Sequence, residues 1–304
     1  MTPRTPNEQL SQLPGGPLPS GGIELSLPGD GVALAATRWP GEGTPVLLLH
    51  GLASQRRFWD PVVARLAVRP LVALDARGHG ASGKPDSGYA LADVVADIGP
   101  ALDALGLSRV VVVGHSWGAA VALHLAAHHP ERVLAVVAID GGFNPPGSLA
   151  EDRAALRRRL EPPRTALPPE QLETMLSGGP LAPWWSPATA DALRPLFGLG
   201  ADGLARPMLS FERHMQVLDG LLDADVEATL AAVRSPAWLV SCEPPGAEQW
   251  TAAKAAALER ADRLLARPRL QRWGGALHDV PLQWPALVAG LVRAAADEVV
   301  GGRG

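Results

Sequence analysis

The sequence is poor in the residues that build covalent or metal-bound frameworks. Its 304 residues include a single cysteine, Cys242. One cysteine excludes an internal disulfide and a cysteine zinc cluster. No run of 18 or more apolar residues is present, so we expect no membrane span. We likewise expect no metal and no cofactor.

Charge of one sign is also scarce. The formal net charge is −4, and charged residues make up 19 % of the chain. The arginines within residues 153–159 are interrupted by apolar residues, which is typical of a solvated helix face. Nucleic-acid binding needs a basic patch, so no nucleic-acid partner is expected. The predicted partner is a small-molecule, mostly apolar substrate.

The pattern along the chain predicts one α/β domain with an insertion. Residues 1–21 are rich in proline, glycine, serine and threonine and lack the apolar core of a signal peptide. We interpret them as a flexible leader, and the cytoplasm is then the default location. Residues 22–141 and 234–304 alternate short apolar runs with helical patterns, which predicts a doubly wound, mostly parallel sheet. Residues 142–233 have no convincing strand and are interpreted as a helical cap above the carboxyl ends of the strands.

The expected strands and helices follow from these runs. Asp30-Gly31 between two apolar runs indicates a hairpin. Strands are predicted at residues 23–27, 32–39, 45–49, 70–74, 110–113, 133–139, 237–240 and 269–273. Helices are predicted at residues 58–67, 91–105, 118–127, 247–261 and 284–299.

The most informative segment surrounds Ser116. A run of valines enters Gly114-His115-Ser116-Trp117-Gly118 and continues into a helix of small residues. The two glycines allow a tight, strained turn between strand and helix, which exposes the serine hydroxyl at the edge of the sheet. The dipole of the following helix favours negative charge there. The pattern predicts that Ser116 is a nucleophile.

These residues resemble the α/β-hydrolase superfamily, and the resemblance extends over about residues 22–300. Three further segments carry it in the family's order: His50-Gly51-Leu52, residues 75–82, and Leu277-His278-Asp279. The resemblance implies a serine hydrolase whose general base is His278, placed after the last strand. It also implies an oxyanion hole formed by the backbone N–H groups of Leu52 and Trp117.

The acidic partner of His278 has two candidates. Most family members place this acid after the next-to-last strand, where the sequence has Glu243 followed by two prolines. Some relatives take it from the end of the preceding strand, which is Asp140 here. Two glycines, Gly141 and Gly142, follow Asp140 and are expected to allow close approach of the histidine loop. Asp140 is therefore favoured, and Glu243 is the alternative.

Aromatic residues suggest the character of the substrate pocket. We predict that Phe58, Trp59, Trp184 and Trp185 contribute to an apolar wall. Such a pocket favours an uncharged carboxylic ester, thioester or lactone, cleaved through an acyl-enzyme. Alternatives are hydrolysis of a carbon–carbon bond, a proline-iminopeptidase-like activity, and a ligand-binding receptor built on the same fold.

Overall fold

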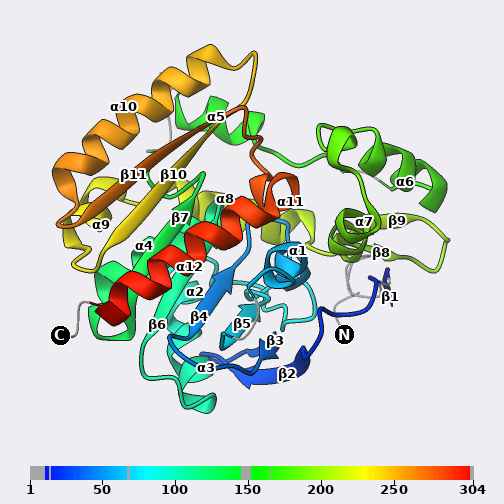
Figure 1. Cartoon of the computed structure of the whole chain (residues 1–304). Coiled ribbons are helices and arrows are strands. Elements are labelled where there is room, and N and C mark those ends of the chain that lie inside the picture. Colours follow the sequence, from blue (N-terminus) through cyan, green and yellow to red (C-terminus); the bar gives the residue numbers. More distant parts are fainter. Residues whose placement is uncertain (1–10, 14, 67–68, 145–151, 165, 302–304) are drawn as a thin grey trace.

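A computed structural model describes residues 11–13, 15–66, 69–144, 152–164 and 166–301. One large sheet runs through this part of the chain (Figure 1). Its strands are β2 (Ile23–Pro28), β3 (Ala33–Trp39), β4 (Val46–Leu49), β5 (Leu71–Leu74), β6 (Val110–His115), β7 (Val133–Ile139), β10 (Ala237–Glu243) and β11 (Pro268–Gly274). All the predicted strands are therefore confirmed, with small changes at their ends.

The eight strands follow the order β11-β10-β7-β6-β4-β5-β3-β2. The six strands from β11 to β5 pair in parallel, whereas β3 pairs antiparallel with both β5 and β2. Parallel strands bring their carboxyl ends to the same edge of the sheet, which is where open α/β sheets bind ligands. The predicted doubly wound, mostly parallel sheet is confirmed.

Helices cover both faces of this sheet (Figure 1). One face packs against α1 (Asp60–Val63), α11 (Val280–Gln283) and α12 (Pro285–Gly301). The other packs against α2 (Leu91–Ala96), α3 (Ile98–Ala104), α4 (Trp117–His128), α9 (Val226–Ala232) and α10 (Glu248–Leu264). Within β6, Val111 and Val113 join the first core while Val110 and Val112 join the second. This two-sided burial explains why the central strands are continuous apolar runs.

A smaller lobe lies beside the sheet and continues above it (Figure 1). Its elements are α5 (Arg153–Arg159), α6 (Pro169–Ser177), α7 (Pro187–Leu193), β8 (Phe197–Leu199), β9 (Ala205–Pro207) and α8 (Phe211–Leu222). The two short strands differ from the expectation of a purely helical segment. The two strands pair antiparallel with each other. Each has only three residues, which is too short to show an alternating pattern in the sequence.

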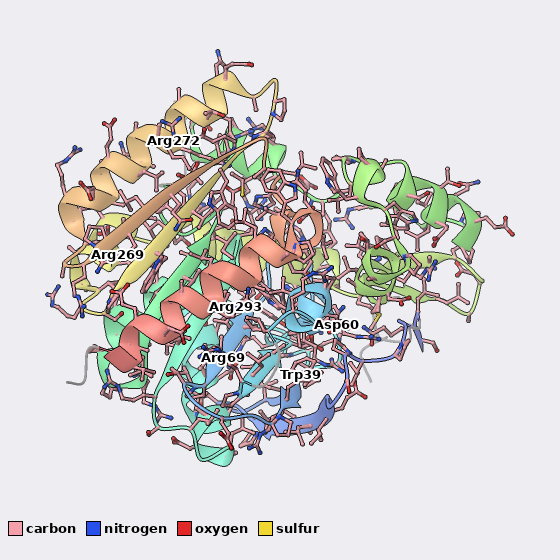
Figure 2. All side chains as sticks on the ribbon, in the orientation of Figure 1. Trp39, Asp60, Arg69, Arg269, Arg272 and Arg293 are labelled. Carbon is pink, nitrogen blue, oxygen red and sulfur yellow. The ribbon has the colours of Figure 1, made fainter. Side chains whose placement is uncertain are left out.

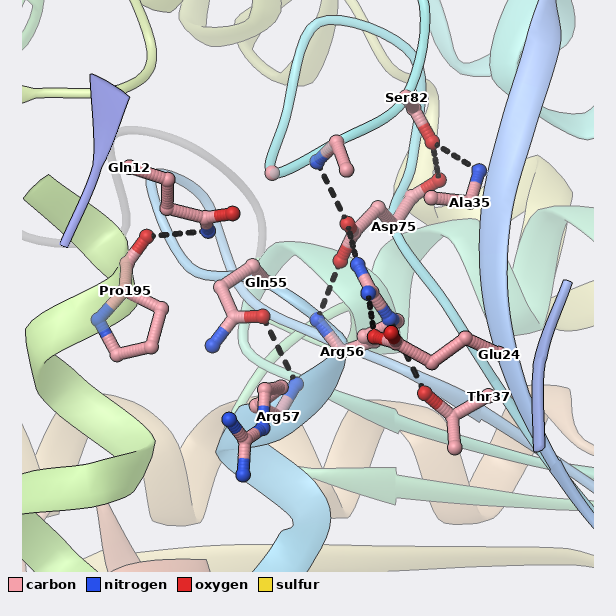
Figure 3. Close-up of polar contacts among 12 residues, drawn as sticks. Gln12, Glu24, Ala35, Thr37, Gln55, Arg56, Arg57, Asp75, Ser82 and Pro195 are labelled. Atoms are coloured by element: carbon pink, nitrogen blue, oxygen red, sulfur yellow. Dashed lines mark hydrogen bonds and ion pairs between the residues drawn. The ribbon is translucent and has the colours of Figure 1, made fainter. Parts of the chain in front are cut away.

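Part of the stretch predicted as a flexible leader lies among the described residues. Ser11–Gln12 forms β1, which pairs antiparallel with β8. Gln12 Nε2 donates a hydrogen bond of 2.7 Å to the carbonyl of Pro195 (Figure 3). The Arg57 guanidinium donates to the carbonyls of Gly16 and Pro17. This stretch thus contacts the smaller lobe through β8 and Pro195, and the main domain through Arg57; residues 1–10 lie outside the described residues.

The last part of the segment predicted as the cap packs against the sheet. Helix α9 packs against α4 and α10, and its Leu230 is fully buried in the core on that face of the sheet. Val217 of α8 joins the same core. Leu230 and Val217 therefore help to bury that face of the sheet, although the chain enters α8 from the smaller lobe.

The edge strand β11 carries arginines along its length (Figure 2). Arg269 pairs with Glu298 of α12 at 2.9 Å, and Arg272 pairs with Glu243 of β10. Charged side chains along an edge oppose pairing with another chain. No helix of the described residues has the length and apolar character to cross a membrane.

Candidate active site

Ser116 lies in a strained turn between β6 and α4. Its φ of 55° and ψ of −120° are rare for a residue with a side chain. The neighbouring glycines make the turn possible: a Cβ on Gly114 would lie 2.1 Å from the carbonyl oxygen of Gly118. A Cβ on Gly118 would lie 2.4 Å from the carbonyl oxygen of His50. The hydroxyl of Ser116 is thereby held at the amino end of α4, where the helix dipole favours negative charge.

Three side chains from separate segments meet at this turn. His278 Nε2 lies 3.0 Å from Ser116 Oγ, and His278 Nδ1 lies 2.7 Å from Asp140 Oδ2. Asp140 directly follows β7, and His278 lies in the loop after β11. Because a carboxylate only accepts, Nδ1 carries the proton and Nε2 presents its lone pair to the serine hydroxyl. The arrangement is that of a nucleophile, a base and an orienting acid.

The alternative acid, Glu243, lies elsewhere. Its carboxylate is paired with the guanidinium of Arg272 on the neighbouring strand. The structure thus brings Ser116, His278 and Asp140 together and leaves Glu243 outside the group. Asp140 occupies the left-handed region with φ of 51°, a conformation that aspartate tolerates better than most residues.

The loop that carries His278 is fixed by hydrogen bonds. His115 Nε2 donates to the carbonyl oxygen of His278 at 2.8 Å. Gln283 accepts from the N–H of Leu277 at 2.7 Å and donates to the carbonyl of Gly275 at 3.1 Å. Burial, together with repulsion from His278, lowers the pKa of His115 to about 4, so this ring is neutral near pH 7. His278 is therefore positioned by neutral donors and acceptors.

Charge at the site favours an ionised Asp140. Burial opposes the charged carboxylate, but its hydrogen bond to His278 and the charges of His278 and Lys254 lower the pKa of Asp140 below its ordinary value. For His278, desolvation alone lowers the pKa, but the hydrogen bond and charge of Asp140, with the charge of Asp279, raise it overall. In the described ranges, no three His, Cys, Asp or Glu side chains are grouped as metal ligands would be.

Lys254 is the residue that the sequence analysis missed. It lies in the middle of α10, and its Nζ is 2.6 Å from Asp140 Oδ1. Helical periodicity placed this residue on a helix but gave no indication of a partner. The contact arises because α10 packs beside β10, which neighbours β7 in the sheet.

The predicted oxyanion-hole residues border the same space. Leu52 and Trp117 both line the cavity next to Ser116. A Cβ on Gly51 would lie 3.2 Å from the Cβ of Ser116, so the loop after β4 approaches the turn closely. Neither the N–H of Leu52 nor that of Trp117 is hydrogen-bonded to an acceptor within the described part of the chain. Both amides are thus available to an anion.

A buried ion pair supports this loop from below (Figure 3). The Arg56 guanidinium pairs with Asp75 and also donates to Thr37 Oγ1 at 3.1 Å and to Glu24. The Arg56 N–H donates to Asp75 Oδ1 at 2.6 Å. Ser82 Oγ in turn donates to the carbonyl of Asp75. The network connects β2 and β3 to the two loops beside the site.

Aromatic contacts complete this support. The ring of His79 stacks on Trp117, with centroids 5.2 Å apart and an interplanar angle of 22°. His50 Nε2 accepts from the N–H of Ala76 at 3.1 Å. The segment 75–82 therefore braces the loop after β4 and the residue that follows Ser116.

The cavity at Ser116 has a volume of about 450 Å³ and mostly apolar walls. Leucines contribute most of them: Leu91, Leu156, Leu160, Leu218, Leu221 and Leu222. Trp250 of α10 and Trp117 are the aromatic members. His278, whose side chain is 55 % exposed, presents its free edge to this space. The volume is in the range of small-molecule sites.

The four aromatic residues predicted to form the wall lie elsewhere. Phe58 and Trp59 are buried beneath the site in the core on the α12 face, and Phe58 stacks on His115 with centroids 5.0 Å apart. Trp184 and Trp185 follow α6 in the smaller lobe, and Trp185 packs against that same core. The correction has a physical reason: burial in the core accounts for Phe58 and Trp59, whereas Trp184 and Trp185 are half-buried in the smaller lobe and do not line the cavity. Leucines, several of them from α5 and α8, line the pocket instead.

Comparison with known proteins agrees with this fold. The family model described as the alpha/beta hydrolase fold matches residues 44–177. A 2-(acetamidomethylene)succinate hydrolase of Mesorhizobium japonicum is 39 % identical over 104 residues, which are 34 % of this chain and 37 % of that protein. A putative carbamate hydrolase, RutD, of Caulobacter segnis is 38 % identical over 120 residues, 38 % of this chain and 45 % of that protein. The alignments thus span less than half of these two curated relatives.

The likeness to a solved structure is more extensive. The crystal structure of E-2-(acetamidomethylene)succinate hydrolase superposes with a TM-score of 0.77 and 28 % identity, covering 91 % of this chain and 99 % of that one. The sheet order, the family match and this likeness agree. The chain has the α/β-hydrolase fold.

Proposed function

We propose that this protein is a serine hydrolase that cleaves a carboxylic ester, or a related thioester or lactone, through an acyl-enzyme. The observation that carries the proposal is the 3.0 Å contact between Ser116 Oγ and His278 Nε2, with Asp140 on the other ring nitrogen. Serine is a weak nucleophile unless a base takes its proton. The family match and the hydrolase names of the relatives support the same reaction class.

In the proposed reaction, His278 Nε2 accepts the proton of Ser116 as Oγ bonds to the acyl carbon. The carbonyl oxygen becomes negative and is stabilised by the N–H groups of Leu52 and Trp117. The acyl–oxygen bond then breaks, and the leaving alcohol takes the proton from His278. A water molecule attacks the acyl-serine in the same way and releases the acid.

The cavity supports an apolar substrate. Its walls are mostly apolar, with leucine the most frequent residue, and such walls stabilise the aliphatic part of a substrate by removing it from water. Lys254, which also lines the cavity, is already paired with Asp140. An uncharged ester with an aliphatic chain fits these surroundings better than a peptide with a charged amino terminus.

The test compares wild type with Ser116→Ala on p-nitrophenyl esters and with a fluorophosphonate probe. We expect wild type to hydrolyse the esters and to be labelled, and Ser116→Ala to lose roughly 10⁴-fold or more in kcat. Ser177→Ala in α6 is the control, because its hydroxyl bonds only within that helix. Near-wild-type turnover by Ser116→Ala would contradict the proposal, and tight ester binding without turnover by wild type would favour a ligand receptor.

A second candidate follows from the structural likeness. A relative that superposes over nearly its full length is named for 2-(acetamidomethylene)succinate, which makes this compound a candidate substrate here. Arg159 lines the cavity and brings positive charge to a pocket that would then hold carboxylates. Direct assay of that compound beside the ester series distinguishes the two: a higher kcat/KM for the succinate derivative would replace the ester proposal.

A further inference from the structure

We propose that Lys254 is a positioning residue of the Ser116–His278–Asp140 group, which fixes the Asp140 carboxylate and offsets its negative charge at His278. The inference rests on the proposed function and deepens it. In a chain whose cationic side chains are otherwise almost all arginine, Lys254 is one of two lysines, the other being Lys84.

The two oxygens of the Asp140 carboxylate have different partners. Oδ1 accepts from Lys254 Nζ at 2.6 Å and from the N–H of Cys242 at 2.9 Å. Oδ2 is thereby left to His278 Nδ1 at 2.7 Å. Lys254 Nζ also donates to the carbonyl of Cys242 at 2.8 Å, which anchors the ammonium to β10. The carboxylate is held on three sides, so its plane is fixed relative to the imidazole.

Burial makes this pairing consequential. The side chains of Lys254 and Asp140 are 3 % and 1 % exposed. A buried ion pair contributes little net stability, because desolvation offsets most of the attraction, yet removal of one member leaves a costly unpaired charge. The ring of Trp250 lies 5.5 Å from Lys254 Nζ, within the range of a cation–π contact. Lys254 is therefore well enclosed, and the carboxylate of Asp140 lies between it and His278, the proposed base.

The effect on His278 follows from the charges that face it. Asp140 and Asp279 stabilise the protonated ring, whereas Lys254 opposes it. The fourth neighbour, His115, is neutral near pH 7 because burial, with repulsion from His278, lowers its pKa to about 4. If Lys254 lost its charge, the pKa of His278 would rise further. The base would then be protonated, and unable to accept the serine proton, up to a higher pH.

The decisive variant is Lys254→Met, which keeps the apolar stem and removes the ammonium. We expect the acid limb of the kcat/KM profile to move up by about one pH unit. We also expect kcat on its plateau to fall about tenfold with KM nearly unchanged, because Asp140 loses its fixed orientation while the apolar walls of the cavity are kept. The control is Arg260→Gln on the same helix, which removes a charge that faces Glu227. It should leave both the limb and kcat at their wild-type values.

A purely structural lysine would give a different result. In that case Lys254→Met would lower thermal stability, but the limb and the NMR titration of the His278 ring would match wild type, and this outcome would overturn the inference. If Lys254→Met does not fold, Lys254→Arg decides the question, because a guanidinium keeps the charge and alters the geometry. A lower kcat with an unmoved limb supports the inference, and any other pattern contradicts it.

The two proposals fail separately. The NMR titration of His278 in wild type and Lys254→Met needs no turnover. If wild type neither hydrolyses esters nor reacts with the fluorophosphonate probe, the proposed function fails whatever Lys254 does. If wild type is active and the His278 titration is the same in both proteins, only the role of Lys254 is refuted.

Discussion

Gly141 lies so close to the backbone of Ser116 that a Cβ on Gly141 would be 2.2 Å from the carbonyl oxygen of Ser116. Gly142 makes a similar approach to α4, where its Cβ would lie 2.8 Å from the backbone of Ala119 and Ala120. These glycines were expected to admit the histidine loop. The structure places the Ser116 turn there instead, because β6 and β7 are parallel neighbours and the residues that follow them come together.

We predict that Gly141→Ala lowers kcat at least tenfold and destabilises the fold by about 2 kcal/mol. The added methyl group meets backbone, which cannot move aside as a flexible side chain does, so the Ser116 turn must shift. Gly99→Ala in α3 is the matched control, since a Cβ there meets nothing within 4 Å. Thermal unfolding and ester turnover measure both effects. A Gly141→Ala protein with wild-type kcat would show that the turn tolerates displacement.

Sequence reasoning predicted the sheet because its central strands are buried on both faces and therefore read as uninterrupted apolar runs. The segment around Ser116 was recognisable because its turn requires glycines at fixed spacing. His278 was recognisable by its place after the last strand. The pocket wall was not predictable. Five of its leucines lie in α8, in α5 or directly after α5, and the packing of these helices over Ser116 depends on how the inserted segment folds back.

Lys254 illustrates the same limit in a single contact. Its neighbours Asp140 and Cys242 lie 114 and 12 residues away along the chain. Only the order of β7 and β10 in the sheet, with α10 packed beside them, brings these groups together. The smaller lobe was misread in a comparable way, because β1 pairs with β8 across more than 180 residues.

The identity of the acid is open to a direct test. We predict that Asp140→Asn lowers kcat by roughly 10⁴-fold, because an amide can stabilise the wrong tautomer of His278 and cannot stabilise the imidazolium. Glu243→Gln should leave kcat within about threefold of wild type, since its partner is Arg272 on the edge strand. Kinetics on the same ester measure both variants. Equal losses in the two would mean that the contact of Asp140 with His278 is not the one used in turnover.

The wild-type pH profile tests the state of the base. The raised pKa of His278 places the acid limb of kcat/KM above pH 6.5, the ordinary value for histidine. Activity should fall as the pH drops through this limb, because protonated Nε2 has no lone pair for the serine proton. Asp140, whose pKa is lowered, stays ionised throughout. A limb below pH 6.5 would indicate that another group controls the reaction.

The last prediction concerns the apolar cavity. Each methylene that passes from water to the leucine walls contributes about 0.8 kcal/mol, or about fourfold in kcat/KM. We therefore expect kcat/KM for p-nitrophenyl esters to rise by this factor for each methylene group added to the acyl chain, starting from the acetate. The rise should level off when the cavity is filled. Such a rise requires that the acyl chain of the ester enters the cavity and does not remain in solvent.

Leu160→Trp tests whether these walls set the limit. Leu160 lines the cavity and is 42 % exposed, so a larger side chain is accommodated without disturbing the core. We expect the indole to occupy part of the cavity and to shift the preferred ester to a shorter chain, with acetate hydrolysis nearly unchanged. Leu287→Trp on α12 is the matched control, because that leucine is 47 % exposed and lies away from the cavity. An identical dependence on acyl-chain length in both variants would mean that the acyl chain binds outside the leucine-lined space. That result would remove the physical reason for an apolar substrate.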